Sequence, residues 1–492
     1  MEEIEFNLQV PPAGEPALRA EFERRGARRV HLRAHYYDTA DGLLARSGLA
    51  LRLRHEGRRW VQTLKAASDN AARREEDNVV VKLASGAAPV LDVWRHTEGE
   101  ASAALHRALG RISGRSGLVE RCATDIWRYR FDVRLPDALI EVALDIGSIT
   151  AGARTLPVCE VEFELKEGRL ASLVEWAQSW ARDGGLWLNS VSKAERGFRL
   201  ASGQAHGPPV KAVAPRLAAP WSGGRWLRAV LGPVLEQVLA NASELATGSE
   251  DEEHVHQLRV GLRRLRTALR ELGTLSQRVD PTWDESLART AAALGVLRDN
   301  EAVAGAVEPL LRRVGAPRTR WTMPSAGLAA GDIVRERRFQ CALIEMLGLA
   351  LSDEDDDLAV SPSKAMEHVG KRLDQLHKRI VHSAQRFESL RPEQQHSARK
   401  RLKRLRYLAE FAGPACKRGA LRRYLDLLEP AQEALGIHND VAVAAVQFRR
   451  DAVHQPDSLF AAGYLQAHLT WTAHLARNAL RDVASAPRPW HR

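Results

Sequence analysis

A stretch rich in proline, glycine and alanine divides this chain of 492 residues into two parts with different hydrophobic patterning. The stretch covers residues 201–224, contains Gly207-Pro208-Pro209 and Gly223-Gly224, and shows neither a helical nor a strand period. Before it, apolar and polar residues alternate, which is typical of strands; after it, apolar residues recur every three or four positions, which is typical of helices. The patterning predicts an α+β multidomain protein, with a β-rich domain in residues 1–200, a linker, and an all-α domain in residues 225–490.

Short β-rich segments fill the N-terminal domain and indicate an antiparallel sheet. The predicted strands are Glu3–Val10, Ala50–Arg54, Trp60–Leu64, Asn78–Leu83, Trp127–Leu135, Ala138–Ile146 and Val158–Lys166. Helices are predicted at Glu15–Arg25, Ser102–Leu109 and Leu170–Asp183.

The C-terminal part contains an internal repeat. The segment His256–Arg266 recurs as His396–Arg406, and Leu294–Asp299 recurs in the same order as Leu435–Asp440. Two matched pairs predict a duplicated helical bundle whose halves each begin with a basic helix. We expect the two Leu-Gly segments to form turns in which Asp299 and Asp440 cap helices or pair with arginines.

The formal net charge of +10 is unevenly distributed. Residues 1–200 hold 30 Lys/Arg against 29 Asp/Glu, and the remaining residues hold 42 against 33. The excess in the C-terminal part favours a polyanionic partner such as polyphosphate or nucleic acid, although a helical protein with solvated basic faces has the same composition.

Other features favour a cytoplasmic protein. The four cysteines stand far apart, without the spacing of a disulfide framework or a metal site. The N-terminus is acidic, and apolar runs are too short for a membrane span. We therefore expect neither export nor a membrane span.

Acidic and basic residues alternate on the strands of the N-terminal domain. Glu3 and Glu5 lie two apart, so they share one face of a strand, as do Glu160, Glu162 and Glu164. Arg52 and Arg54, and Arg128 and Arg130, repeat the spacing with the opposite charge. Such a sheet forms either a salt-bridged outer surface or a polar tunnel. A tunnel of this kind suits a metal-bound polyphosphate, because carboxylates hold divalent cations and Arg and Lys bind phosphate oxygens.

Several segments resemble known families over nearly the whole chain outside the linker. The chain resembles a CYTH domain, which is a member of the triphosphate tunnel metalloenzymes, followed by a CHAD domain, as in bacterial inorganic triphosphatases. The matching segments are Glu3-Ile4-Glu5, a Tyr36-Tyr37-Asp38-Thr39 turn, Gly48–Arg54, Trp60–Lys65, Glu141–Asp145, Cys159–Lys166 and Ser192–Gly197. The resemblance implies an eight-stranded antiparallel β tunnel with flanking helices.

The resemblance also implies a metal-dependent inorganic triphosphatase, in which water attacks a terminal phosphoryl group of tripolyphosphate. The implied ligands of Mg²⁺ or Mn²⁺ are Glu3, Glu5, Glu160 and Glu162, with Asp145 as a further candidate. The implied phosphate-binding residues are Arg52, Arg54, Lys65, Arg73, Arg128, Arg130, Lys166 and Lys193. Among these two groups, Glu3, Glu5, Lys65 and Arg54 are the candidate catalytic residues.

The chain departs from the family pattern at Asn7. The opening motif of the family is Glu-x-Glu-x-Lys, and an asparagine cannot supply the ammonium of the motif lysine. A tunnel that binds polyphosphate without hydrolysing it is therefore an alternative function. Nucleotide chemistry is a third alternative function, because the family includes adenylate cyclases and thiamine triphosphatases. No segment of the sequence, however, indicates a pocket for a base.

Basic residues form stripes on the two repeated helices, each beside a stripe of leucines. The members are His256, Arg259, Arg263 and Arg266 in the first copy, and His396, Arg399, Lys403 and Arg406 in the second. Aligned like charges repel one another, and an anionic partner relieves the repulsion. CHAD domains are associated with polyphosphate, so the resemblance implies that these residues bind it and that the protein associates with polyphosphate granules. Nucleic acid is not favoured, because there is no helix-turn-helix signature and no set of stacking aromatics.

Overall fold

The computed structural model describes residues 2–67, 73–83, 88–110, 117–216, 222–317, 328–352, 360–413 and 416–490, without the side chains of residues 2, 67, 73–74 and 296–304. The chain divides into two compact units. Unit 1 comprises Met1–Lys211, Leu235–Leu258 and Val334–Asp353, and unit 2 comprises Ala212–Val234, Arg259–Ile333 and Glu354–Arg492.

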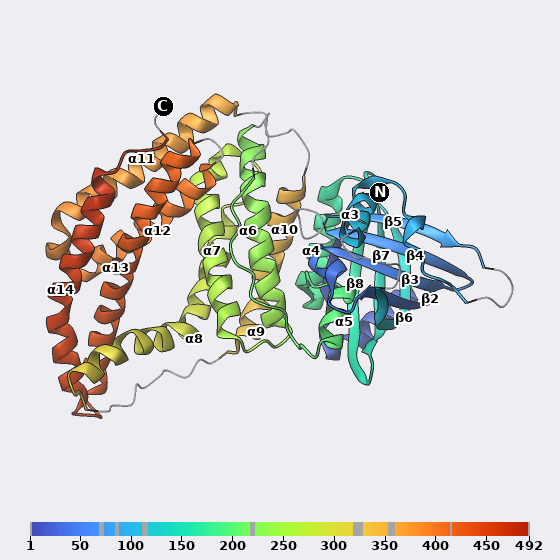
Figure 1. Ribbon diagram of the computed structural model, residues 1–492, viewed down its shortest axis with the longest axis horizontal. Helices are drawn as coiled ribbons and strands as arrows, with labels where there is room; N and C mark the ends of the chain where they lie inside the picture. The colour runs from blue at the N-terminus through green and yellow to red at the C-terminus, as the bar shows by residue number, and fades with distance from the viewer. Residues whose placement is uncertain are drawn as a thin grey trace. The chain divides into compact units, whose positions relative to one another are not determined.

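Strands lie in the first part of the chain, and long helices make up the rest (Figure 1). The strands are β1 (Glu2–Gln9), β2 (Arg28–Thr39), β3 (Leu49–Glu56), β4 (Arg59–Ala67), β5 (Arg73–Val81), β6 (Leu118–Arg134), β7 (Ala138–Ala151), β8 (Arg154–Gly168) and β9 (Trp187–Leu188). The helices of the β-rich part are α1 (Glu15–Arg24), α2 (Leu43–Arg46), α3 (Gly99–Leu109), α4 (Leu170–Gly184) and α5 (Lys193–Ala201). The helices that follow are α6 (Gly223–Ala246), α7 (Glu252–Leu272), α8 (Thr282–Arg313), α9 (Ala330–Val334), α10 (Arg337–Leu351), α11 (Pro362–Arg386), α12 (Pro392–Phe411), α13 (Arg418–Asp451) and α14 (Ser458–Ser485).

Eight antiparallel strands of unit 1 close into a barrel. Their order is β5-β4-β3-β2-β6-β7-β8-β1, and β1 pairs with β5 to complete the ring. The short β9 adds to the other end of β1, where Leu188 lies opposite Leu8. The predicted eight-stranded antiparallel barrel is confirmed, and we call its interior the tunnel.

The strand β2 was missed by the sequence analysis. Val30, Leu32, Ala34 and Tyr36 alternate there with His31, Arg33 and His35, so the sequence does carry the period-two signal of a half-buried strand. The expectation of a turn at residues 36–39 was wrong, because they form the end of β2. The buried carboxylate of Asp38 accepts hydrogen bonds from the backbone N–H groups of Leu44 and Ala45, which fixes the start of α2.

Apolar side chains of the barrel point outward under the helices. Phe163 of β8 packs edge-on against Trp180 of α4, with ring centroids 5.7 Å apart. Leu51 of β3 and Leu64 of β4 are fully buried in one cluster with Leu105 of α3. Because successive side chains on a strand face opposite sides, the charged residues between these apolar ones face the tunnel.

The helix α5 packs against inward-facing apolar side chains at one end of the tunnel. Its residue Ala194 lies in a buried cluster with Cys122 and Ile126 of β6 and Ile149 of β7. The approach is close at Gly197, where a Cβ atom would lie 2.3 Å from Sγ of Cys122. Glycine therefore allows α5 to reach the inner wall of the barrel.

Two further segments complete unit 1. The backbone N–H of Leu188 donates to Oε1 of Gln340 on α10, and that of Ser190 donates to Oγ of Ser243 on α6. These bonds join α10 and the C-terminal part of α6 to the strand-rich region, so the compact units do not follow the expected domain limits. The helix α6 also begins inside the expected linker, at Gly223.

In unit 2, α11, α12, α13 and α14 pack against one another as a helical bundle (Figure 1). The repeated basic segments lie on α7 and α12. The expectation of turns at the Leu-Gly segments was wrong, because these lie inside α8 and α13. Leu294 and Leu435 are buried on the core faces of these helices, and packing of a helix face outweighs the small cost of one glycine.

Candidate functional site

Rows of carboxylates cross three neighbouring strands inside the tunnel. In the strand register, Glu164 of β8 lies opposite both Glu5 of β1 and Glu141 of β7. Further along β8, Glu160 lies opposite Asp145 of β7. Like charges directly opposite each other destabilise a sheet, so these rows require cations among them.

The tunnel opens into a cavity of ≈ 1540 Å³. Of the residues that the sequence analysis selected, Glu3, Glu5, Arg52, Arg54, Lys65, Arg128, Arg130, Asp145, Glu162, Lys166 and Lys193 line this cavity. The candidate ligand Glu160 is fully buried and is not among the lining residues. Arg73 is the first residue of β5, and its backbone pairs with Ile4 of β1. The side chain of Arg73 lies outside the described residues.

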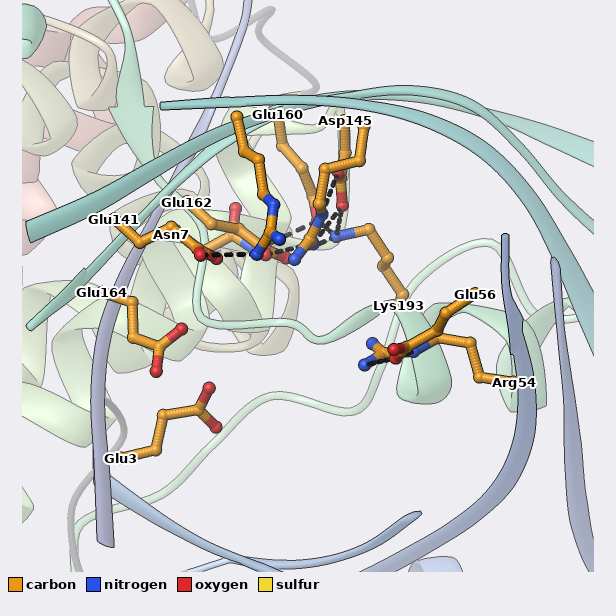
Figure 2. A network of polar contacts seen from close by, with 12 residues as sticks. Glu3, Asn7, Arg54, Glu56, Glu141, Asp145, Glu160, Glu162, Glu164 and Lys193 are labelled. Atoms are coloured by element: carbon orange, nitrogen blue, oxygen red, sulfur yellow. Dashed lines mark hydrogen bonds and ion pairs between the residues drawn. The ribbon is translucent and has the colours of Figure 1, made fainter. Parts of the chain in front are cut away.

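Three carboxylates and three cations form a buried network that we call the deep cluster. Its members are Asp145, Glu160, Glu162, Arg128, Lys193 and Arg196. Figure 2 labels the three carboxylates and Lys193. Oxygen atoms of the three carboxylates lie within 4.8 Å of one another. Arg128 donates two parallel hydrogen bonds of 2.7 Å to Asp145 and also contacts Glu162.

The remaining two cations of the deep cluster come from α5. Nζ of Lys193 lies 2.8 Å from Oδ2 of Asp145 and 2.6 Å from Oε1 of Glu162, and it also contacts Glu160. Arg196 contacts the second oxygen of Glu160. Burial raises the pKa of Glu160, but the charges of Arg196 and Lys193 outweigh it and hold the pKa at about 2. The carboxylate is therefore ionised at neutral pH.

The local sequence of α5 explains how both cations reach one carboxylate. Ser192 caps the helix by accepting a hydrogen bond of 3.2 Å from the N–H of Glu195. Lys193 and Arg196 are three residues apart, so they lie on the same side of the helix. Arg196 was not among the selected residues, although its spacing from Lys193 within the recognised segment could have identified it.

A second charged group surrounds Lys65 of β4. Nζ of Lys65 lies 3.1 Å from Oε2 of Glu3 and 2.8 Å from Oε2 of Glu76. Arg52 lies 3.6 Å from Glu76 and donates a hydrogen bond of 3.3 Å to the hydroxyl of Tyr36. The sequence analysis missed Glu76, and its position opposite Lys65 in the β4–β5 register is the signal that identifies it.

Glu3 and Glu76 differ in protonation. Burial raises the pKa of Glu3 to about 8, and its hydrogen bond to the neighbouring carboxylate of Glu76 adds to the rise. Burial also opposes ionisation of Glu76, but Lys65 and this same hydrogen bond hold the pKa of Glu76 below its usual value. At neutral pH the two groups therefore share one proton, with Glu76 as the carboxylate.

The other predicted phosphate-binding cations also contact carboxylates. Nε of Arg54 donates a hydrogen bond of 2.6 Å to Glu56 on its own strand. The remaining two pairs are Arg130 with Glu141 at 2.8 Å and Lys166 with Glu164 at 2.6 Å. Among the described side chains, every cation selected for the tunnel thus contacts an acid.

Asn7 faces the deep cluster, and its Nδ2 donates a hydrogen bond of 3.0 Å to Oε1 of Glu160. This contact fixes the orientation of the amide, because a carboxylate can only accept. Oδ1 of Asn7 is buried and has no hydrogen-bond partner in the part of the chain that the structure describes. Asn7, which stands in the place of the motif lysine, therefore contacts Glu160. Lys193 and Arg196 already neutralise this carboxylate.

In unit 2, the charges of three predicted polyphosphate-binding residues shift the pKa of a fourth, Lys403. Burial and the positive charges of Arg263 and Arg399 lower the pKa of Lys403 to about 7; Asp440 opposes this shift, and Arg259 adds to it. Nε of Arg263 is buried without a hydrogen-bond partner among the described residues. We call Arg259, Arg263, Arg399 and Lys403 the basic cluster.

The other members of the predicted stripes behave differently. Nε of Arg266 lies 2.9 Å from Asp284 of α8, and Nε of Arg406 lies 3.1 Å from Glu410 of its own helix. Nδ1 of His396 lies 2.8 Å from Oδ1 of Asn439. His256 lies on the part of α7 that belongs to unit 1. Arg266, Arg406 and His396 thus each contact a side chain outside the stripes.

Comparison with known families matches a CYTH domain to residues 1–198 and a CHAD domain to residues 229–449. The chain therefore consists of a CYTH domain followed by a CHAD domain. An inorganic triphosphatase from Haemophilus influenzae is 29% identical over 210 residues, which cover 42% of this chain and 56% of that protein. The chain thus spans about half the length of this curated relative.

Two solved structures show similarity to parts of the chain. The crystal structure of the CHAD domain from the plant Ricinus communis covers 57% of this chain and 98% of that one, with 27% identity and a TM-score of 0.42. A putative adenylyl cyclase from Hippeastrum, described as having a dominant triphosphatase activity, covers 41% of this chain and 96% of that one, with 17% identity and a TM-score of 0.29.

No helix in the described ranges combines the length and the apolar character that crossing a bilayer requires.

Proposed function

We propose that the tunnel hydrolyses inorganic tripolyphosphate with the help of Mg²⁺ or Mn²⁺, and that the basic cluster binds longer polyphosphate. The observation that carries the first part is the mixture of charges in one cavity. Glu3, Glu5 and Glu162 line the same walls as Arg52, Arg54 and Lys65. The similarity to an inorganic triphosphatase supports this function.

The carboxylates of the tunnel fit a divalent cation. Asp145, Glu160 and Glu162 place hard oxygen atoms within 4.8 Å of one another, and Glu3 and Glu5 stand on the adjoining strand β1. When bound, such a cation supplies neutralisation of phosphate charge and polarisation of the reacting phosphoryl group.

The side chains of the chain itself bind and orient the substrate. Arg52, Arg54 and Lys65 point into the cavity, where they can exchange a carboxylate partner for phosphate oxygens. Hydrolysis needs only water as the attacking group, so no nucleophilic side chain is required.

The test is phosphate release from tripolyphosphate by the full chain with Mg²⁺ or Mn²⁺. Glu5→Gln removes one charge from the tunnel wall and should lower the rate about 100-fold or more, because residues that place charge at the reacting group typically contribute that much. Glu23→Gln, at an exposed position of α1, is the matched control and should have no effect. Equal rates for wild type and Glu5→Gln would contradict the proposed site.

A binding-only tunnel is the second candidate, and Asn7 is the observation that favours it. In that case the wild-type protein binds tripolyphosphate in a calorimeter but releases no phosphate. Binding with turnover supports the enzyme, and binding without turnover supports the second candidate.

Polyphosphate binding by the basic cluster is tested separately by gel shift on the full chain. Arg263→Glu should weaken binding about 10- to 100-fold, since it removes one phosphate contact and adds a repulsive charge. The control is Arg289→Glu, at an exposed position of α8. Equal loss in both variants would point to general charge and not to this cluster.

A further inference from the structure

The ammonium group of Lys193 lies among the three carboxylates that are arranged to hold a cation. It contacts Asp145, Glu160 and Glu162, and these are the same residues whose oxygens converge within 4.8 Å (Figure 2). A lysine ammonium is a compact charge with three donors, so each donor has one carboxylate here. The ammonium of Lys193 therefore compensates the negative charge of the three carboxylates, as a bound cation would at this position.

We infer that Lys193 is an internal occupant of the cation position and is exchanged for a divalent cation when tripolyphosphate enters the tunnel. This inference rests on the proposed function. In the exchange, the ammonium leaves the three carboxylates and turns to the phosphate oxygens. Lys193 is thus a positioning residue that links binding of the cation to binding of the substrate.

Charge balance explains why substrate favours the exchange, although a saturating concentration of the cation alone can also drive it. Three carboxylates of the deep cluster face the three cations Arg128, Lys193 and Arg196, so the cluster is neutral as it stands. A divalent cation that replaced Lys193 would leave a buried ammonium without an anionic partner, which is costly. Triphosphate provides that partner. Binding of the cation and binding of triphosphate should therefore strengthen each other.

Lys193 is the member of the deep cluster that is best placed to move. It is the first residue of α5, and it lines the cavity. Arg196 does not line the cavity, and Arg128 is held by two hydrogen bonds to Asp145. A lysine also has a flexible four-carbon side chain, whereas a bidentate guanidinium is fixed in one plane.

The first test is calorimetric titration of Mn²⁺ into the full chain without phosphate. Removing the competing ammonium should make Lys193→Met bind Mn²⁺ at least about tenfold more tightly than wild type, since vacating charged carboxylates favours a cation. Lys82→Met removes the same charge at an exposed position of unit 1 and should match wild type. Equal or weaker binding by Lys193→Met would overturn the inference.

A second test uses wild-type protein and does not depend on the folding of a variant. Lysine acylation followed by mass spectrometry reports the accessibility of Lys193, whose side chain is only 13% exposed. Mn²⁺ alone, at a saturating concentration, should increase acylation of Lys193, and added tripolyphosphate should suppress it. Protection or no change with Mn²⁺ would contradict the exchange.

The two tests are separable from the test of the proposed function. If the wild type hydrolyses tripolyphosphate but Lys193→Met shows no gain in Mn²⁺ affinity, the enzyme stands and the exchange fails. If the wild type releases no phosphate, the triphosphatase fails whatever the titration shows.

Discussion

The tunnel of unit 1 and the basic cluster of unit 2 both gather Lys and Arg side chains, yet they balance these charges differently. In the tunnel each described candidate cation contacts a carboxylate, so burial of charge is compensated within the fold. In the basic cluster, burial and then the neighbouring positive charges lower the pKa of Lys403 to about 7. A site whose cations contact carboxylates must exchange partners to bind phosphate, whereas an anion at the basic cluster directly stabilises the charged form of Lys403.

The largest expected effect comes from breaking the balance in the tunnel. Arg128→Met removes one of the two buried cations that contact both Asp145 and Glu162, leaving Lys193 alone to compensate two carboxylates, and should destabilise unit 1 by about 3–5 kcal/mol. Calorimetric melting of the full chain measures this. Arg107→Met, at an exposed position of α3, is the control. If both variants melt like the wild type, the pairing in the deep cluster does not stabilise the fold.

The helix α5 positions Lys193 and Arg196 in the deep cluster, and its packing against the barrel wall depends on Gly197. Gly197→Ala places a Cβ about 2.3 Å from Sγ of Cys122, so it should destabilise unit 1 by about 1–3 kcal/mol through overpacking. Because Cys122→Ala removes that sulfur, the double variant should recover most of the loss. The absence of recovery in the double variant would mean that Gly197 matters for another reason.

In unit 2, pH should change polyphosphate binding through Lys403. In the fold the pKa of this lysine is lowered from 10.5 to about 7, so the folded state binds fewer protons than the unfolded state between these values. Stability of unit 2 therefore falls as pH drops from about 10.5 to about 7, and an added anion favours protonation.

We expect polyphosphate to bind at least about tenfold more weakly at pH 9 than at pH 6, with proton uptake on binding near pH 8. Calorimetry in buffers of different ionisation enthalpy measures both quantities. Lys403→Met should lose most of this pH dependence, and Lys400→Met, at an exposed position of α12, should retain it. The same pH profile in both variants would remove Lys403 from the explanation.

The same contrast explains how much could be predicted from the sequence. Period-two alternation predicted most strands, and the repeat located the basic helices α7 and α12. Neither could show that Arg266 pairs with Asp284, because that contact joins separate helices. Glu76 and Arg196 were missed for a similar reason, since their partners Lys65 and Glu160 become neighbours only through strand register and the packing of α5.

The smallest expected effect concerns Asn7, which contacts Glu160 in the tunnel. Asn7→Lys adds a fourth cation beside the deep cluster, which Lys193 and Arg196 already neutralise. A charged hydrogen bond to phosphate contributes about 1.5–3 kcal/mol, and repulsion from these neighbours should cancel part of it. We therefore expect tripolyphosphate hydrolysis to rise by less than about tenfold, the factor that corresponds to 1.4 kcal/mol.

The variant Asn7→Ala separates the two changes that Asn7→Lys makes. It loses the hydrogen bond of 3.0 Å to Glu160 without adding a charge, so any gain specific to lysine comes from the ammonium. Phosphate release by wild type, Asn7→Ala and Asn7→Lys under identical conditions gives the comparison. An inactive wild type that stays inactive as Asn7→Lys would contradict an impaired enzyme and favour a tunnel that only binds, because restoring the motif charge would then have restored nothing.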